Sequence, residues 1–185
     1  MEFRLLTKQE LLDNYGSRMR FDFPPTELKP SELLSAAFDT GAYFARGLFD
    51  ENGAMLAYAY FFSAGDYMLL DYFAVDRSLR GQGVGSKALE FIKEMPELSA
   101  RKLLLEVEDP DFSADSADND IRVRRISFYL HGGIADTGAR SRVFGVDYRL
   151  LCPQPISKED ALRGIGELYK SLLPTPIFEK NVVLK

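Results

Sequence analysis

Three glycines stand within five positions of segment 80–86, which reads Arg-Gly-Gln-Gly-Val-Gly-Ser. Because glycine has no Cβ atom, the backbone of such a segment can approach a ligand closely. The residues that follow are predicted to form an amphipathic helix. Its first N–H groups lack acceptors within the helix, and that end carries a partial positive charge. These features together predict a site for an anionic ligand, phosphate groups in particular.

Two other phosphate-binding patterns compete for the same glycines. Gly83-x-Gly85-x-x-Ala88 fits the degenerate dinucleotide fingerprint, and Glu106 follows at about the 20-residue spacing of that motif. However, a bend at residues 76–79 separates the glycines from the preceding strand. The phosphate loop of ATPases requires Gly-Lys-Ser/Thr, whereas Ser86-Lys87 has the reverse order. A glycine-rich turn without a ligand remains the third alternative.

The elements around the glycines favour a mixed sheet. Residues 67–75 are apolar and predict a strand that leads into the glycine segment. Residues 41–49 and 54–63 are strand-like and meet at Asn52-Gly53, a strong hairpin signal. Three strands before the glycines count against a dinucleotide-binding fold, whose fingerprint follows the first strand. A helix and a strand at 101–108 come after them, and this unit predicts a parallel crossover.

The pattern Arg-x-x-Gly-x-Gly, after a strand that ends in Phe-Ala-Val, resembles the coenzyme A signature of the GNAT superfamily of N-acetyltransferases. The resemblance implies that acetyl-CoA is the co-substrate and that the loop amides hold its pyrophosphate. It also implies that the preceding strand offers backbone groups to the pantetheine arm, because a neighbouring strand splays away. By position, the implied cofactor-binding residues are Phe73, Ala74, Val75, Arg80, Gly81, Gln82, Gly83, Val84, Gly85 and Ser86.

A second cluster lies on a predicted helix over residues 119–131, where Arg122, Arg125 and Tyr129 share one face. Segment 128–134, Phe-Tyr-Leu-His-Gly-Gly-Ile, resembles the second motif of the same superfamily, with isoleucine in place of an aromatic residue. In that superfamily the tyrosine protonates the departing CoA sulfur. The resemblance implies that Tyr129 is the general acid and that both arginines contact CoA, although the family often has asparagine where Arg122 stands. The alternative for Tyr129 is a core tyrosine with a satisfied hydroxyl.

Acyl transfer to an amine requires the neutral amine, so a base or a water molecule must take up its proton. Glu106 is the first candidate for this base and Asp71 is the second. Partial burial beside splayed strands would raise the pKa of a carboxyl group towards a useful value. Either residue could instead be a solvated carboxylate at a strand end.

Composition sets the outer limits. The chain has 185 residues, of which 46% are hydrophobic and 28% charged, as expected of a single globular domain. A net charge of −5 argues against non-specific nucleic-acid binding. No apolar run approaches the length of about 20 residues that a membrane span needs. With one cysteine, one histidine and no secretory signal at the first residues, we expect no disulfide, no structural zinc and a cytoplasmic location.

The remaining segments predict further elements. Thr7 and Glu10 form a capping box for a helix over 8–15, and Ser31 is expected to cap a second helix. The polar span 109–118 predicts a mobile loop. Ser157 caps a last helix, and prolines at 174 and 176 predict an extended tail after it.

The expected fold class is α/β (α+β), with a mixed, mostly antiparallel central sheet flanked by helices. Residues 1–151 would form the acetyltransferase domain. Residues 152–185 would be a C-terminal helical extension that packs on the domain or on a partner subunit, which would allow a homodimer.

The expected function is transfer of an acetyl group from acetyl-CoA to a primary amine of a small molecule or a peptide, by direct attack on the thioester. A non-catalytic acyl-CoA-binding regulatory module and a dinucleotide-binding oxidoreductase stay open as alternatives. The net acidity favours a cationic acceptor, but no motif in the sequence identifies one.

Overall fold

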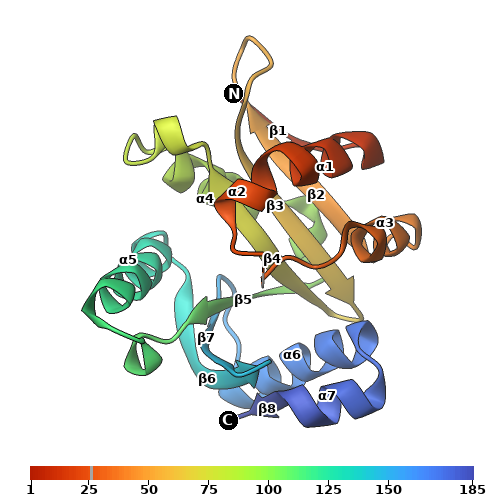
Figure 1. Ribbon diagram of the computed structural model, residues 1–185, viewed down its shortest axis with the longest axis vertical. Helices are drawn as coiled ribbons and strands as arrows, with labels where there is room; N and C mark the ends of the chain where they lie inside the picture. The colour runs from red at the N-terminus through yellow and green to blue at the C-terminus, as the bar shows by residue number, and fades with distance from the viewer. Residues whose placement is uncertain (26) are drawn as a thin grey trace. The chain divides into compact units, whose positions relative to one another are not determined.

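Eight strands form one mixed sheet, mostly antiparallel and flanked by helices, in the computed structural model of this protein (Figure 1). The structure describes residues 1–25 and 27–185. The strands follow the order β1-β2-β3-β4-β5-β7-β6-β8 along the sheet. Their bounds are β1 Glu2–Leu5, β2 Tyr43–Phe49, β3 Met55–Ala64, β4 Tyr67–Val75, β5 Lys102–Glu108, β6 Ala135–Val143, β7 Val146–Cys152 and β8 Val182–Leu184. The expected fold class is confirmed.

Seven α-helical segments accompany the sheet in the described residues. They are α1 Lys8–Asn14, α2 Arg20–Asp22, α3 Ser31–Asp39, α4 Val84–Lys93, α5 Ser116–His131, α6 Lys158–Leu172 and α7 Thr175–Asn181. None of the helices described is long and apolar enough to cross a membrane. The chain divides into two compact units, Met1–Phe62 with Asp71–Phe91 and Ser63–Leu70 with Ile92–Lys185.

The first unit begins with the capping box that the sequence predicts. The Thr7 hydroxyl accepts a hydrogen bond from the Glu10 amide, and the Glu10 carboxylate accepts one from the Thr7 amide. Two expectations about these helices are wrong. The helical path does not end at residue 15, because a π-helical turn, Tyr15–Met19, carries it on into α2. Helix α3 is capped by Pro30, whose carbonyl accepts from the amides of residues 33 and 34, and Ser31 already lies inside the helix.

Buried tyrosines make up much of the core of the first unit. Tyr43, Tyr58 and Tyr60 are fully buried, and each hydroxyl has a polar partner. Tyr60, for example, donates to the Leu11 carbonyl at 2.8 Å and so ties the middle of β3 to α1. A buried phenol needs such a partner, because an unpaired polar group in the interior is costly. The bonds of Tyr58 and Tyr60 fix how α2 and α1 lie on the sheet.

The second unit contains the parallel pair that the crossover predicts. Residues Tyr67–Leu70 of β4 pair in parallel with Lys102–Leu105 of β5. Strand β5 then pairs antiparallel with β7, and β6 pairs with both β7 and β8. The hairpin between β6 and β7 turns at Phe144-Gly145, both with positive φ.

The span 109–118 is more regular than the polar sequence predicts. Residues Pro110–Phe112 form a 3₁₀ turn, and α5 begins at Ser116, three residues before the expected start. The Asp115 carboxylate accepts a hydrogen bond from the Asp118 amide at 2.9 Å and caps the helix. Aspartate is favoured at this capping position, so the acidic run contains a helix start.

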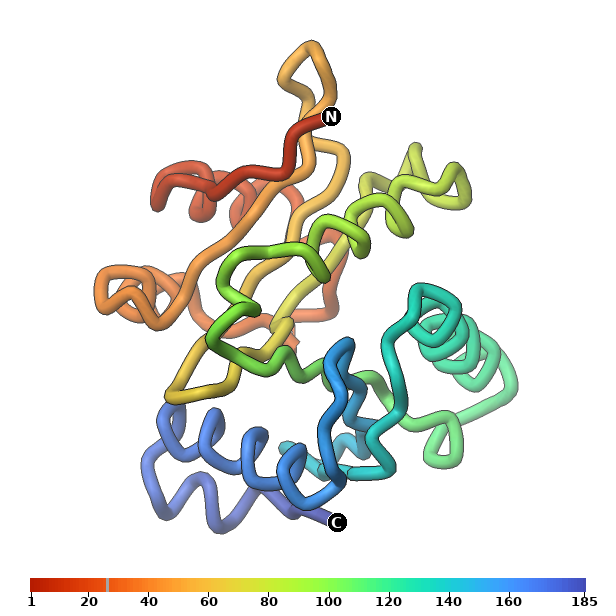
Figure 2. The backbone as a smooth tube through the Cα atoms, turned by 180° about the vertical axis from the view of Figure 1, so that it is seen from behind, coloured from red at the N-terminus to blue at the C-terminus, as the bar shows by residue number. Residues whose placement is uncertain are grey.

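The expectation of an extended tail after Pro174 is also wrong. Pro174 is the N-cap of α7, because proline is well tolerated in and just before a first helical turn. Strand β8 follows and closes the edge of the sheet through mutual backbone bonds between Arg140 and Lys185 of 2.9 and 2.8 Å. Helices α6 and α7 lie side by side in both backbone views (Figures 1 and 2).

The apolar stripe of α6 is buried within its own unit, and Ala161, Ile165 and Leu168 are almost fully covered. The helix lies close to β4 at Gly164. A Cβ atom there would lie 2.3 Å from Cδ1 of the Tyr67 ring, well inside van der Waals contact.

We therefore expect Gly164→Ala to lower the free energy of unfolding by about 1–3 kcal/mol, the usual cost of overpacking. Gly16→Ala is the matched control, because no described atom lies within 4 Å of its added Cβ. Alanine should be neutral or mildly stabilising there, since residue 16 is helical. Urea unfolding of both variants tests this, and equal midpoints would contradict the close packing of α6.

Candidate functional site

The glycine segment forms an open turn at the N-terminus of α4. Gly81 and Gly83 have φ of +75° and +81°, and no described atom lies within 4 Å of a Cβ built on either. The first intrahelical bond runs from the Lys87 amide to the Gly83 carbonyl at 3.0 Å. The amides of residues 84–86 precede that bond, so the helix offers them no acceptor. This geometry is a cradle for an anion such as a phosphate.

The turn before the cradle is held by Asp76. Its carboxylate accepts from the Ser78 amide at 3.0 Å and from the Ser78 hydroxyl at 2.6 Å. These bonds lower the pKa of Asp76 below its ordinary value. The Asp76 amide donates to the Leu56 carbonyl on β3, so the turn is tied to the sheet. The cradle is therefore anchored on its strand side.

Apolar packing between β4 and α4 also anchors the cradle. Phe73 and Val75 of β4 pack against a buried cluster that includes Val84 and Ala88 of α4. Ala74 is buried on the other face of the strand. The side chains of Phe73 and Val75 thus support the helix, while the contact of their backbone with a pantetheine arm stays a prediction.

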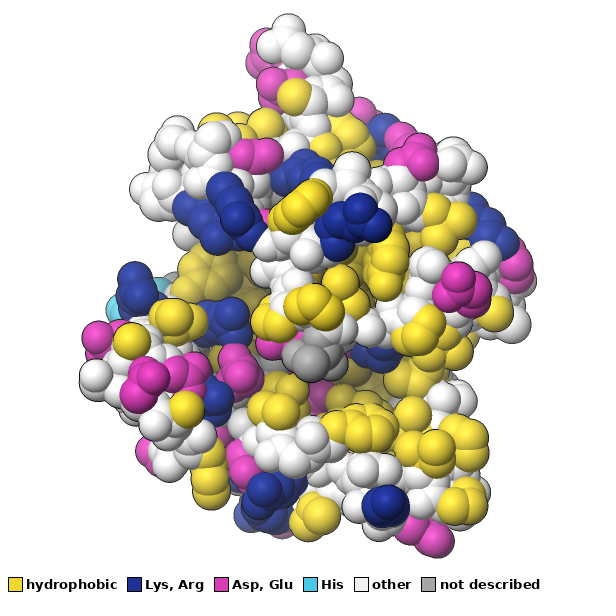
Figure 3. Space-filling model, in the orientation of Figure 1, with side chains coloured by type: hydrophobic (Ala, Val, Ile, Leu, Met, Phe, Trp, Pro, Cys, Tyr) yellow, Lys and Arg dark blue, Asp and Glu magenta, His cyan; other side chains and the backbone are white. Residues whose placement is uncertain are grey.

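Asp22 of α2 is a member of this region that sequence reasoning missed. Its carboxylate is 7% exposed and pairs with Arg80 at 3.1 Å and Arg77 at 3.3 Å. It also accepts a hydrogen bond from Tyr58 at 2.9 Å, and Arg77 donates to the Phe21 carbonyl. Figure 3 shows Lys and Arg side chains gathered over α2. Asp76 in the same region pairs with Arg18 at 3.4 Å, so two carboxylates meet three guanidinium groups and a net positive charge is left beside the cradle.

No local sequence signal identifies Asp22, because it lies 55 and 58 positions before its two arginines. Only the folded chain brings these charges together. Arg80 is half exposed and also donates to the Val75 carbonyl at 3.3 Å. Its contact with a pyrophosphate stays a prediction, as does that of Gln82, whose amide group donates to the Ser78 carbonyl.

Asp71, the second candidate base, belongs to a buried ion pair. Its carboxylate is 6% exposed, lies 2.5 Å from the Lys29 ammonium and accepts from the Tyr43 hydroxyl at 2.6 Å. The Tyr72 hydroxyl accepts from the Lys29 amide and donates to the Glu27 carbonyl. These contacts fasten the segment around Lys29 to β4. Lys29 thus already supplies a positive charge at this carboxylate.

Glu106, the first candidate base, has a different environment. Each of its carboxylate oxygens accepts a hydrogen bond of 2.5 Å, one from the Ser141 hydroxyl and one from the Tyr169 hydroxyl. Glu106 itself is partly buried, whereas both donors are buried. Two hydroxyl groups thus orient this carboxylate. Sequence reasoning identified Glu106 but neither donor.

Tyr129, the candidate acid, lies half-buried near the end of α5. Burial raises the pKa of Tyr129 to about 12, although the positive charge of Arg125 acts in the opposite direction. The phenol therefore keeps its proton throughout the neutral range. A group in this state can donate a proton and does not serve as a base.

Arg122 and Arg125, two of the three arginines on α5, differ in how firmly they are held. Arg122 is 12% exposed and pairs with Asp118 at 2.9 Å and Glu108 at 3.5 Å. It also donates to the Asp109 carbonyl at 3.1 Å. Arg125 pairs with Glu108 at 2.6 Å but is 52% exposed. Arg122 thus ties α5 to the end of β5, while Arg125 has room to exchange Glu108 for another anion.

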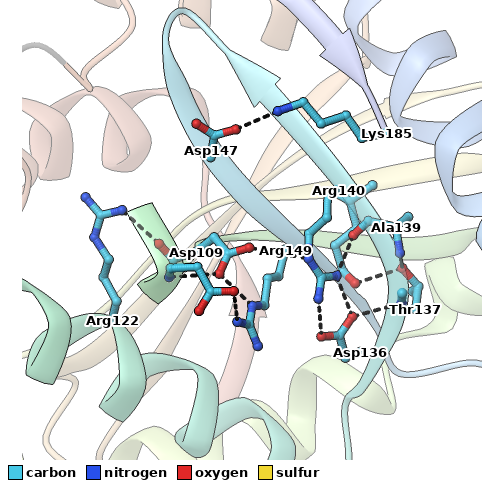
Figure 4. Close-up of polar contacts among 12 residues, drawn as sticks. Asp109, Arg122, Asp136, Thr137, Ala139, Arg140, Asp147, Arg149 and Lys185 are labelled. Carbon is cyan, nitrogen blue, oxygen red and sulfur yellow. Dashed lines mark hydrogen bonds and ion pairs between the residues drawn. The ribbon is translucent and has the colours of Figure 1, made fainter. Parts of the chain in front are cut away.

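Asp109 is the centre of a charge network next to these arginines. Figure 4 shows Arg122 and Arg149 both reaching Asp109. Its carboxylate is 4% exposed and lies 2.8 Å from Arg149 and 3.4 Å from Arg140. Asp109, Asp118 and Glu108 are thus each paired with arginine. Across residues 1–25 and 27–185, no group of three or more His, Cys, Asp or Glu side chains is arranged to hold a metal ion.

Comparison with a family model places this geometry in context. Residues 9–117, more than half of the chain, match the model of the acetyltransferase (GNAT) family. No match to a curated protein is found.

Solved structures resemble the fold. A GNAT-family protein from Bacteroides thetaiotaomicron is 22% identical with a TM-score of 0.68, over 89% of this chain and 93% of that one. The ribosomal-protein-S18-alanine N-acetyltransferase of Escherichia coli is 22% identical with a TM-score of 0.55, over 84% and 94%. An aminoglycoside 6'-N-acetyltransferase complexed with coenzyme A is 15% identical with a TM-score of 0.62, over 84% and 99%. At these identities the likeness shows the fold.

The buried ion pair of Asp71 leads to a prediction about stability. Asp71→Asn leaves the partly buried Lys29 ammonium without its charged partner, so we expect a loss of about 2 kcal/mol of unfolding free energy, between the values for exposed and fully buried pairs. Asp39→Asn is the matched control, because Asp39 forms an exposed pair with Lys8 at 2.6 Å. An exposed pair contributes at most about 1 kcal/mol. Chemical denaturation measures both, and similar losses would show that Asp71 and Lys29 are not held as described.

Proposed function

The chain belongs to the acetyltransferase (GNAT) family, and from this membership we propose that it transfers the acetyl group of acetyl-CoA to a primary amine. The observation that carries the proposal is the anion cradle at the start of α4. Two glycines with positive φ open it, and three amides ahead of the first intrahelical bond line it. A pyrophosphate is a suitable ligand for such a group of amides.

In this proposal acetyl-CoA supplies an activated thioester. The loop residues Arg80–Ser86 hold its pyrophosphate, and the positive charge left over from the Asp22 pairs favours that anion. The backbone of Phe73, Ala74 and Val75 aligns the pantetheine arm. Arg125 is the more adaptable arginine on α5 and Arg122 the more constrained one, because their exposures differ.

The reaction proposed is direct attack. The amine nitrogen forms a bond to the thioester carbon, and the carbon–sulfur bond breaks. Glu106, or water beside it, takes the proton that the amine loses, and Tyr129 gives its phenol proton to the sulfur. Because the pKa of Tyr129 is about 12, the proton is in place at neutral pH. Asp71 is a less suitable base, since it is bound to Lys29.

The acceptor is proposed at the level of its chemistry, a primary amine on a small molecule or a peptide. Proteins of similar fold include enzymes named for aminoglycosides, for spermidine and for a ribosomal protein. A turnover screen with acetyl-CoA over aminoglycosides, polyamines, amino acids and peptides tests the proposal. If none of the amines in the panel leads to release of CoA, while CoA still stabilises the chain thermally, a non-catalytic binding module is favoured. Stabilisation by NAD and not by CoA would favour an oxidoreductase.

Replacing Tyr129 with phenylalanine removes the proton donor and keeps the ring. We expect Tyr129→Phe to lower kcat about 100-fold, the lower range for general acid catalysis, with the Kd for CoA unchanged. Steady-state kinetics and calorimetry measure the two quantities. Tyr67→Phe is the control, because the Tyr67 hydroxyl bonds Arg163 of α6. Full turnover in Tyr129→Phe would rule out the acid role.

The cradle can be tested with two glycines of equal backbone geometry. Gly83 and Gly53 both have φ of +81°, and no described atom lies within 4 Å of either added Cβ. Alanine at either position should cost about 1–2 kcal/mol of stability through left-handed strain. Only Gly83→Ala should also raise the Kd for CoA, by about tenfold or more, because its methyl group enters the space of the pyrophosphate. Equal CoA affinity in the two variants would contradict the cradle.

A further inference from the structure

Glu106 is held by hydroxyl groups that lie outside the part of the chain matching the family model. That match ends at residue 117, whereas the donors are Ser141 on β6 and Tyr169 on α6. We propose that Tyr169 is a positioning residue for Glu106, so that the C-terminal extension completes the catalytic machinery. This inference rests on the proposed function, in which Glu106 accepts the proton of the amine.

The chemistry of the two donors supports this role. Both donors are hydroxyl groups, and each lies 2.5 Å from its carboxylate oxygen. Each donor gives one hydrogen bond to one of the two carboxylate oxygens, so the plane of the carboxylate is set by the two hydroxyls. Asp71 contrasts with it, because the ammonium of Lys29 pairs with that carboxylate.

The placement of Tyr169 is determined by the packing of α6. The ring is nine-tenths buried, and Ser141 is fully buried. Ile165 and Leu168 of the same helix are buried, and at Gly164 the helix backbone lies against the Tyr67 ring. A hydroxyl on such a helix has little freedom to move away from its acceptor. The fold thus brings a residue 63 positions distant to the candidate base.

The hydrogen bond from Tyr169 to Glu106 would also be present if it served stability alone. The test therefore needs a measured quantity that a change in stability does not affect. Tyr169→Phe removes the hydroxyl and keeps the ring. A donor that stabilises the ionised carboxylate lowers the pH at which it takes up a proton, so its loss moves that pH upward. We expect the acidic limb of the kcat/KM profile to shift up by about one pH unit, and kcat to fall about tenfold. KM for acetyl-CoA should not change.

Tyr67→Phe is the matched control for these measurements. The Tyr67 hydroxyl accepts from Arg163 at 3.2 Å, so it links α6 to β4 without touching Glu106. This variant removes a hydroxyl of the same kind, from a tie on the same helix. We expect it to leave the acidic limb and kcat as in the parent chain. Thermal unfolding of both variants confirms that each is folded at the assay temperature.

A second measurement does not need turnover. Carbon-13 NMR of the glutamate side-chain carboxyls follows their titration in the full chain, and Glu106→Gln identifies the resonance of Glu106. The midpoint of that resonance should rise by about one pH unit in Tyr169→Phe and stay in place in Tyr67→Phe. An unchanged midpoint would overturn the positioning role.

The possible outcomes distinguish failure of the role of Tyr169 from failure of the proposed acetyl transfer. If Glu106→Gln abolishes turnover while Tyr169→Phe leaves the pH profile and kcat unchanged, the tie is structural and the inference fails, but the acetyltransferase stands. If Glu106→Gln retains full turnover, Glu106 is not the base and the inference fails with that assignment. If the parent chain transfers acetyl to no amine, the proposed function fails first.

Discussion

The first amides of helix α4 have no acceptors within their own helix, and the construction of the first unit follows from that fact. The left-handed turns at Gly81 and Gly83 keep side chains out of the space in front of them. Asp76 fixes the turn to β3, and the packing of Val84 and Ala88 with Phe73 and Val75 fixes the helix to β4. The unit thereby holds its helix end in place and leaves the space in front of it open, as the proposed binding of an anion requires.

The role of each buried or partly buried carboxylate in this chain depends on its partners. Asp22, Asp71 and Asp109 are nearly buried, and each is paired with one or more cations. Removing one partner of such a pair leaves a charge stranded in the interior. These residues therefore hold segments together, and proton transfer would disturb what they hold.

Glu106 is distinguished from that group by its neighbours. Two hydroxyls orient it, and they come from β6 and from α6. In the proposed reaction this makes α6 more than a cover for the sheet. The division of labour also explains why Asp71, which shares a strand with the coenzyme signature, is the less suitable base.

The family and the fold class could be predicted from the sequence because the patterns that indicate them are local. The Arg-x-x-Gly-x-Gly pattern, the Asn-Gly hairpin and the Thr7 capping box each depend on residues a few positions apart. Local signals gave wrong predictions where the same residue type is found both in loops and at the start of helices. Pro174 caps a helix where an extended tail was expected, and the acidic run after β5 contains the cap of α5.

The sequence by itself determined the mixed sheet, the glycine turn and the identities of Glu106 and Tyr129 as candidates. Only the tertiary structure decided what those side chains touch. Asp22 meets Arg80 across 58 positions, Lys29 meets Asp71 across 42, and Tyr169 meets Glu106 across 63. Contacts at such separations depend on how whole elements pack, and no short pattern of residues encodes them. The charge state and orientation of a catalytic group depend on those contacts, so chemistry at this level becomes visible only in the folded chain.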